Sequence, residues 1–264
     1  MENGKWFLNI FHFPFFIMLL TIDIGNSLTK FGYFKDEFLF ERIAIPTVRT
    51  ATADGIYNQT PTHSIHSIVI SSVVPELHNS YKEFSEKYFK LAPIFVDSTF
   101  DFGLKIKYHP PENLGIDRIV DAFAAVEKYG KPCIICDFGT ATTIDAVNSN
   151  GEFLGGIIAP GIKTFADSLH SKTSKLPQVE IKKSASVIGD STVASIQAGI
   201  FFGYIGLVEN ILKKMFEELG AKPRIVATGG FAELISESVE LIETVDKNLT
   251  LDGLRLIYEK ILKR

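Results

Sequence analysis

"MLLTIDIGNSLTKFGYF", residues 18–34, places an aspartate at the end of a segment that otherwise has the pattern of a buried strand. Apolar residues precede Asp23, and Gly25 and hydroxylated side chains follow it at once, as in a tight turn. A carboxylate beside glycine and hydroxyl groups at a strand end can meet a cation and phosphate oxygens. A single Asp-x-Gly can equally be a capped turn, so this stretch alone leaves both interpretations open.

The second half of the chain repeats the pattern. "DIGNSLT", from Asp23, aligns residue for residue with "DFGTATT", from Asp137, and an apolar strand precedes each. Two similar halves predict duplicated lobes that face one another across a cleft. A third segment, "VATGG" at 226–230, places glycines after a strand, where a ring or a phosphate can approach the backbone. No P-loop and no dinucleotide-binding fingerprint is present in the sequence.

The remaining patterns predict strands and helices in alternation, which indicates the α/β class with two mixed sheets. Strands are expected at 27–34 and 37–45 with Lys35 and Asp36 at the turn, at 64–75, at 92–97, in three runs between 132 and 161, and at 224–230. Helices are expected at 76–89, 116–130, 167–177 and 195–220, and from Leu251 to Leu262. We predict lobes at residues 18–128 and 129–264, with residues 1–17 as an extension or a misassigned start.

Length and charge narrow the possible partners. A chain of 264 residues with 46% apolar residues can bury a sizeable core. The net charge of -4 gives no broad basic surface for nucleic acid or anionic lipid, so small molecules are the expected partners. The apolar run before Met18 resembles a membrane or signal segment, but it is short for a span and contains Asn9, His12 and Pro14. We therefore predict no membrane association.

The cysteines and histidines offer little chemistry. Cys133 and Cys136 form a C-x-x-C, which can be a redox pair or half a zinc site, but they lie in an apolar run where strand alternation would separate their side chains. We expect inert strand residues and a reducing, cytoplasmic location. His63, His66 and His109 lack partners for a metal cluster and are expected in loops or at the surface.

Asp117, beside Arg118 in "GIDRIVDA", is a further candidate. As a helix-entry acid it could simply be stabilised by the helix macrodipole. It could also accept a proton from an attacking hydroxyl, while the arginine grips an anionic group of the substrate. Phosphoryl transfer needs little more than an oriented hydroxyl, a cation on the phosphates and donors around the moving group.

In this order and spacing the segments "DIGNSLTK", "GIDR", "DFGTATT", "GGIIAPG", "LPQV", "IGDST" and "ATGG" resemble the type III pantothenate kinases, nearly throughout the chain from Met18. That family belongs to the superfamily of acetate kinase, sugar kinases, Hsp70 and actin. The resemblance implies two actin/ribonuclease H-like lobes, each a mixed sheet with flanking helices, around a central cleft. It also implies ATP-dependent phosphorylation of pantothenate, the first step of coenzyme A biosynthesis, by a homodimer.

The resemblance also implies site residues, carried over by position. The ATP site takes Asp23, Ile24, Gly25, Asn26, Ser27, Leu28, Thr29, Lys30 and Thr140. The pantothenate pocket takes Tyr108, Gly115, Ile116, Asp117, Arg118 and Thr192. Asp117 is the expected proton acceptor, and Asp137 the expected ligand of a monovalent cation, K+ or NH4+, while Mg2+ accompanies ATP.

Three positions depart from the usual pattern of the family. Ser27 replaces a common threonine, Asp121 a frequent asparagine, and "SKLP" with Lys175 a more usual Ala-Arg before Leu-Pro. Two alternatives to the pantothenate kinase hypothesis stay open at this stage. One is a catalytically inactive nucleotide-binding regulator of the same fold, and the other is a kinase for a different small alcohol.

Overall fold

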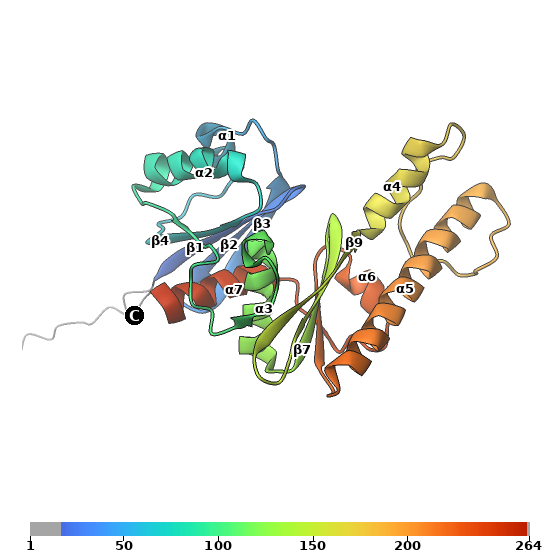
Figure 1. Cartoon of the computed structure of the whole chain (residues 1–264). Helices are drawn as coiled ribbons and strands as arrows, with labels where there is room; N and C mark the ends of the chain where they lie inside the picture. Colours follow the sequence, from blue (N-terminus) through green and yellow to red (C-terminus); the bar gives the residue numbers. More distant parts are fainter. Residues whose placement is uncertain (1–16, 263–264) are drawn as a thin grey trace, which may run out of the picture.

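The computed structural model describes residues 17–262, and its strands form two sheets that lie in separate lobes (Figure 1). The first sheet has the order β3-β2-β1-β4-β5, and the second β11-β10-β7-β8-β9-β6. The first contains β1 (Met18–Ile24), β2 (Leu28–Lys35), β3 (Phe38–Pro46), β4 (Ser67–Ser72) and β5 (Ile94–Phe95). The second contains β6 (Lys105–Ile106), β7 (Cys133–Phe138), β8 (Ala141–Val147), β9 (Glu152–Pro160), β10 (Arg224–Thr228) and β11 (Thr244–Val245).

The two sheets repeat one topology. In each, an antiparallel meander of three strands (β1–β3 or β7–β9) continues through its first strand into two parallel strands (β4 and β5, or β10 and β11). Only β6 lacks a counterpart, and it pairs with β9 at the edge of the second sheet. The predicted α/β class with two duplicated lobes is confirmed.

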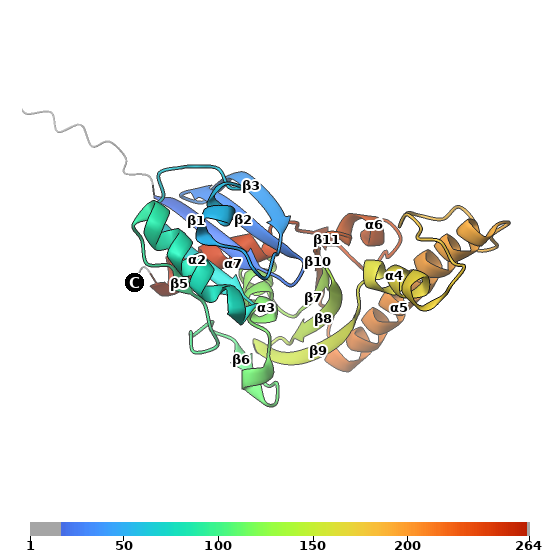
Figure 2. The same cartoon turned by 90° about the horizontal axis from the view of Figure 1, so that it is seen from above.

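Helices cover both faces of both sheets. They are α1 (Ala53–Tyr57), α2 (His78–Phe84), α3 (Ile116–Tyr129), α4 (Ile162–Lys172), α5 (Thr192–Leu219), α6 (Ala232–Ser236) and α7 (Leu249–Ile257). Short 3-10 or π turns occupy Pro75–Leu77, Ser85–Phe89, Pro111–Asn113 and Tyr258–Leu262. Two views place α3 between the lobes (Figures 1 and 2).

Strand alternation divides the apolar side chains among three cores. On β1, Leu20 and Ile22 face a core under α1 and α2, whereas Leu19 faces a core that is shared by both sheets with α3 and α7. On β7, Cys133 belongs to this shared core and Cys136 to the core under α4, α5 and α6. Both thiols are free and fully buried, and burial raises the pKa of Cys133 to about 12, which confirms that they are inert strand residues.

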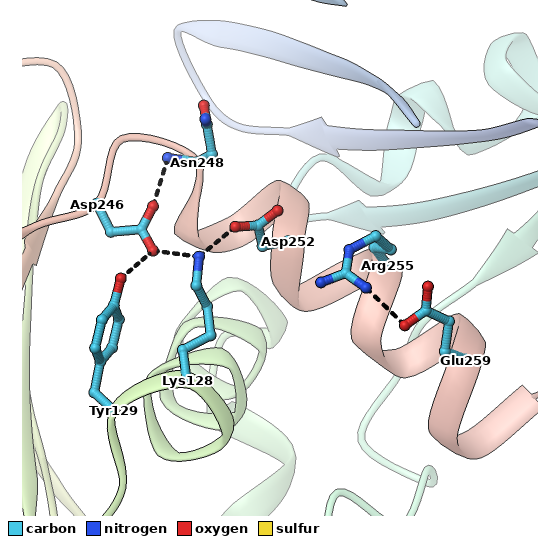
Figure 3. A network of polar contacts seen from close by, with 7 residues as sticks. All are labelled: Lys128, Tyr129, Asp246, Asn248, Asp252, Arg255 and Glu259. Carbon is cyan, nitrogen blue, oxygen red and sulfur yellow. Dashed lines mark hydrogen bonds and ion pairs between the residues drawn. The ribbon is translucent and has the colours of Figure 1, made fainter. Parts of the chain in front are cut away.

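The last helix returns to the first sheet. α7 packs on α3 and contacts β1, β2 and β4, and its crossing with α3 is close because a Cβ at Gly253 would lie 2.8 Å from Val120 Cγ1. Polar contacts hold the entry to α7 against the end of α3: Lys128 Nζ lies 2.6 Å from Asp246 Oδ2 and also contacts Asp252 (Figure 3). The predicted boundaries placed residues 249–257 in the second lobe, but α7 packs against strands of the first sheet.

Some predicted boundaries were wrong. The first hairpin turns at Asp36 and Glu37, because Lys35 still pairs with Phe38. The helix expected at 167–177 is α4, which begins after Gly161 and ends at Lys172, and the final helix begins at Leu249. The predicted extension falls almost entirely on residues 1–16, outside the described residues.

By length and composition, α5 is the one helix within residues 17–262 that could cross a membrane. A core helix passes the same test, and α5 buries eight residues, among them Phe201, Tyr204 and Leu212 in the second lobe's core. His66 and His109 are exposed and His63 half-buried, all three outside helices and strands as expected, and His63 Nε2 lies 2.6 Å from Glu41.

Candidate active site

The strand alternation that sorts the cores also brings two aspartates to one place. On β1 the face that carries Leu19 also carries Asp23, and on β7 the face of Cys133 and Ile135 also carries Asp137. Both carboxylates therefore point from strand ends into the layer between the lobes. This arrangement excludes a merely local role as two separate turn caps.

Asp23 is held by its own lobe. It is 6% exposed, its Oδ2 lies 3.1 Å from Lys30 Nζ, and its Oδ1 accepts a hydrogen bond from Ser71 Oγ at 3.0 Å. Lys30 stands directly opposite Asp23 on β2. The pKa of Lys30 is raised, chiefly by the charge of Asp23 and further by Asp137 and Asp121, so Lys30 carries its proton.

The two Asp-x-Gly turns meet across the cleft. Thr140 Oγ1 donates to Ser27 Oγ at 2.8 Å. The backbone N–H of Gly25 closes the first turn on Leu28 O, and that of Gly139 closes the second on Ala141 O, each at 3.1 Å. The turns thus line one space with hydroxyl and backbone groups that suit phosphate oxygens.

The second turn is one residue shorter than the first. Asp23 pairs with Lys30 across its hairpin, whereas Asp137 pairs with Thr143. The residue-for-residue alignment, which matched Thr29 with Thr143, is therefore wrong beyond the turn. The position that holds the lysine in the first lobe holds Thr143 in the second.

Asp117 and Arg118 occupy the first turn of α3, a helix that contacts strands of both sheets. The carboxylate of Asp117 folds back over the helix start, where its Oδ1 accepts from the Arg118 backbone N–H at 2.8 Å. A Cβ at Gly115 would lie 2.5 Å from that Oδ1, so a side chain at this position would displace the Asp117 carboxylate. Burial, and then the charge of Asp23, raise the pKa of Asp117 above that of an ordinary aspartate.

Arg118 is oriented by two neighbours. Its Nε donates to Asp145 Oδ2 at 3.0 Å and its Nη2 to Asp145 Oδ1, and the Arg118 and Asp145 residues are 6% and 2% exposed. Its guanidinium carbon lies 5.4 Å from the centre of the Tyr108 ring. Gly155, with φ of 99°, leaves space for this ring, because a Cβ there would lie 3.2 Å from Tyr108 Cδ2.

Asp121 and Asp137 each present a buried Oδ1 without a hydrogen-bond partner. Burial raises the pKa of Asp137 to about 6, with Lys30 opposing the shift, and burial together with Asp137 raises the pKa of Asp121 well above its usual range. Gly229, with φ of 93°, closes over Asp137, since a Cβ there would lie 2.4 Å from Asp137 Oδ1. Gly229 of "VATGG" thus lies against the second aspartate, whereas the approach of a ring or phosphate to these glycines stays a prediction.

The structure brings most of the predicted site residues to this cleft. Ile24 is buried in the core under α1 and α2, and Thr29 is buried with its Oγ1 3.0 Å from Thr47 Oγ1. Leu28 is exposed, and Arg49 Nη2 donates to Asn26 Oδ1 at 2.9 Å. Ile116 packs on the shared core.

Thr192 lies in a different part of the second lobe. It begins α5, at the outer end of the projecting α4 and α5 pair (Figure 1). There it lines a groove of about 570 Å³ with Phe165, Leu169 and Ile196. The residues that line this groove include neither Asp117 nor Arg118.

Sequence reasoning missed Asp145 and Ser71. Asp145 lies in "TTIDAV", an acid inside an apolar strand, which is the same pattern that singled out Asp23. Ser71 follows the apolar residues of β4, and no sequence feature marks it as the partner of Asp23.

Within the described part of the chain, no group of three or more His, Cys, Asp or Glu side chains is arranged to hold a metal ion. The orphaned Oδ1 of Asp137 does fit a single hard cation that takes its other ligands from backbone, water or substrate oxygens. Mg2+ characteristically keeps several waters and binds through one or two carboxylates and substrate phosphates, which the Asp23 side of the cleft can offer.

Two duplicated α/β lobes, each with an Asp-x-Gly turn that faces the other, define a fold of the actin-like class. Solved structures with this fold include a candidate transcriptional activator of the Baf family from Campylobacter jejuni, at TM-score 0.61 and 21% identity over 91% of this chain and 98% of that one. A candidate N-acetylmannosamine kinase from Listeria monocytogenes matches at TM-score 0.51 and 13% identity over 92% and 99%. At these identities the likeness concerns the fold alone.

Closer relatives specify the family. The family model of type III pantothenate kinases matches residues 19–214. The type III pantothenate kinase of Koribacter versatilis (strain Ellin345) is 43% identical over 92% of this chain and 96% of its own length, and that of Halalkalibacterium halodurans 41% identical over 92% and 99%. The chain belongs to the type III pantothenate kinase family and is a kinase that uses ATP with a divalent metal.

Proposed function

We propose that this chain transfers the γ-phosphoryl group of ATP to the 4′-hydroxyl of pantothenate, with Asp117 as the proton acceptor. The observation that carries the proposal is the start of α3, where Asp117 and Arg118 face the cleft between the two Asp-x-Gly turns. Family membership supports pantothenate as the substrate, and the geometry supports the proposed roles of the two residues.

Asp117 has the properties of a general base in a phosphotransfer. One of its oxygens is occupied by the Arg118 backbone N–H, which leaves Oδ2 for the hydroxyl of pantothenate. The raised pKa makes this carboxylate a better proton acceptor than a solvated aspartate. The proton of the pantothenate hydroxyl passes to Asp117 as the hydroxyl oxygen bonds to the γ-phosphorus of ATP. The bond between that phosphorus and the ADP oxygen breaks in the same step.

Arg118 is suited to the carboxylate of pantothenate. Its Nε and Nη2 are fixed by Asp145, so the guanidinium is held in one orientation and little side-chain entropy is lost on binding. Tyr108 supports the guanidinium from one side. Arg118 would thus orient the substrate so that its hydroxyl lies near Asp117.

The phosphates of ATP are expected at the turns. Lys30 and the Ser27 and Thr140 hydroxyls would surround them. Mg2+, when bound with ATP on the Asp23 side, would neutralise phosphate charge. Asp137 would hold K+ or NH4+ through its unpaired Oδ1.

A homodimer is supported by the apolar face of α4 and α5. Phe165 and Leu169 on α4 and Val193 on α5 are 43%, 37% and 45% exposed and lie beside the groove that Thr192 lines. Gly199 and Gly203 on α5 border open space, which permits close helix approach. Because that groove does not include Asp117, a second copy would bring Thr192 to the substrate.

The test is an assay of purified protein with ATP, pantothenate, Mg2+ and K+, beside the Asp117→Asn variant. We expect phosphopantothenate from the wild type and a loss of about 10²- to 10⁴-fold in the variant. Folded wild-type protein that yields no phosphopantothenate would contradict the proposal. ATP binding without turnover would favour the inactive regulator, and turnover with other alcohols alone the alternative kinase. The cytoplasmic location stays a prediction.

A further inference from the structure

The longer turn of the first lobe contains one residue more than the turn of the second. In the first turn the N–H of Gly25 closes on the carbonyl oxygen of Leu28, which begins β2. In the second turn the N–H of Gly139 closes on the carbonyl oxygen of Ala141, which begins β8. Leu28 and Ala141 are equivalent in register, because each stands opposite the proline that ends the third strand of its meander.

The extra residue is Asn26. The residues just before β2 and β8, Ser27 and Thr140, correspond to each other, because each carbonyl oxygen accepts from the residue that follows the third strand. The N–H of Thr47 donates to Ser27 O at 2.9 Å, and that of Gly161 donates to Thr140 O at 3.0 Å. Asn26, between Gly25 and Ser27, is therefore left over when the two turns are matched.

One side chain, that of Arg49, holds this extra residue. Arg49 lies in the loop after β3, and its Nη2 donates to Asn26 Oδ1 at 2.9 Å while its Nη1 donates to Glu76, just after β4. The guanidinium thus spans the edge of the first sheet at which β1 ends beside Asp23. The Arg49 and Glu76 side chains are 49% and 53% exposed, so their ion pair contributes little to stability.

The contact with Arg49 decides which way the Asn26 amide faces. A guanidinium has five N–H donors and no acceptor, so the amide has to present its oxygen to Arg49. Its NH2 group then points away from Arg49 as a donor. A phosphate oxygen accepts from such a donor, whereas an amide oxygen in the same place would repel it.

We propose that Arg49 is a positioning residue of the nucleotide site, which holds the Asn26 amide so that Nδ2 donates to a phosphate oxygen of ATP. The inference rests on the proposed function in taking the first turn as the phosphate site. In the second lobe, the residue two positions after Gly161 is Lys163, and it pairs with Asp167 on its own helix at 3.0 Å. The arginine contact thus accompanies the extra residue of the first turn.

Nucleotide affinity tests the proposal without turnover. The Tm is titrated with MgATP in the wild type, Arg49→Met, Asn26→Ala and the double variant, and the dissociation constant is taken from the rise in Tm. We expect this constant to rise about tenfold in Asn26→Ala and about three- to tenfold in Arg49→Met. The Tm without nucleotide should change little in Arg49→Met, which a merely structural role would not explain.

The double variant shows whether Arg49 acts through Asn26. We expect it to bind MgATP no more weakly than Asn26→Ala does, because the two residues then serve one contact. Losses that multiply in the double variant would overturn the positioning role, since Arg49 would act on the nucleotide by its own charge. The matched control is Arg42→Met, at an exposed arginine of β3, and it should leave the affinity unchanged.

Asn26→Asp covers the case in which Arg49→Met does not fold. The carboxylate keeps an acceptor for Arg49 but removes the donor, so the Tm without nucleotide should hold while the affinity for MgATP falls at least as far as in Asn26→Ala. Wild-type affinity in Asn26→Asp or in Arg49→Met would refute the proposal.

A parallel kinase assay separates this proposal from the proposed function. Wild-type protein that binds MgATP with the expected losses in the variants, but yields no phosphopantothenate, contradicts only the proposed function. An active kinase whose affinity for MgATP is the same in Arg49→Met as in the wild type contradicts only the role of Arg49.

Discussion

Replacement of Asp145 by asparagine is expected to damage both stability and substrate binding through Arg118. The pair is almost fully enclosed, with the two residues 2% and 6% exposed, and Asp145 accepts from both Nε and Nη2. Removal of one partner from a buried ion pair costs about 3–5 kcal/mol, because the other charge stays buried without compensation. Because asparagine keeps one acceptor oxygen, we expect a loss at the lower end of this range, about 3 kcal/mol in the free energy of unfolding.

Urea unfolding measures this loss. The free energy of unfolding of a chain of this size falls by about 3 kcal/mol per molar urea, so a loss of about 3 kcal/mol lowers the urea midpoint by roughly 1 M. The matched control is Glu86→Gln, which removes an ion pair with Lys82 whose side chains are 52% and 59% exposed. That pair is expected to contribute less than about 0.5 kcal/mol.

Kinetics separate the orienting role of Asp145 from its structural role. Asp145→Asn should raise the KM for pantothenate, since the Arg118 fork is no longer fixed. The double variant Arg118→Met/Asp145→Leu should recover much of the stability, because apolar residues can replace a buried ion pair, but it should not recover the KM. A loss below about 1 kcal/mol in Asp145→Asn together with an unchanged KM would refute the reasoning.

Three further predictions concern other parts of the molecule. The apparent pKa of the acidic limb in a plot of kcat/KM against pH should lie above that of an ordinary aspartate, because Asp117 must lose its proton to act and burial raises its pKa. An apparent pKa at the ordinary value would contradict this prediction. Gly229→Ala should lower the free energy of unfolding in urea by about 1–3 kcal/mol, and by more than Gly220→Ala does. Both glycines have positive φ, but only at Gly229 would a Cβ also press on Asp137 Oδ1. Equal losses in the two variants would show that this contact is unimportant. Phe165→Glu should halve the mass seen by light scattering with an unchanged circular dichroism spectrum, and a mass equal to that of the wild type would place the dimer contact elsewhere.

Period-two alternation carried most of what the sequence could predict about the site. It places Asp23 and Asp137 on the faces that look into the layer between the lobes, and it sends Cys133 and Cys136 into different cores. The duplicated order of strands follows from the repeated Asp-x-Gly hairpins. These features depend on residues close in sequence, where the pattern itself records the geometry.

Long-range packing was beyond the reach of such patterns. The apolar face of α7 predicts a buried helix, but nothing within residues 249–257 states that it covers the first sheet rather than the second. The apolar residues around Asp145 indicate a buried acid, but they do not indicate its partner, because Arg118 is 27 residues away on another element. Thr192 shows the same limit, because its distance from Asp117 depends on how α5 projects.

The one-residue difference between the two turns explains why duplicated aspartates need not have duplicated roles. In the first lobe the longer turn brings Lys30 opposite Asp23, so that carboxylate has a permanent cation at 3.1 Å. In the second lobe Thr143 stands in that position, and the Oδ1 of Asp137 is left buried and unpaired. A carboxylate whose charge is already matched can turn toward a ligand that brings its own metal, whereas one without a counter-charge has to recruit a cation. The asymmetry of the hairpins thus supports the proposal that Asp23 faces the nucleotide and that Asp137 holds the monovalent cation.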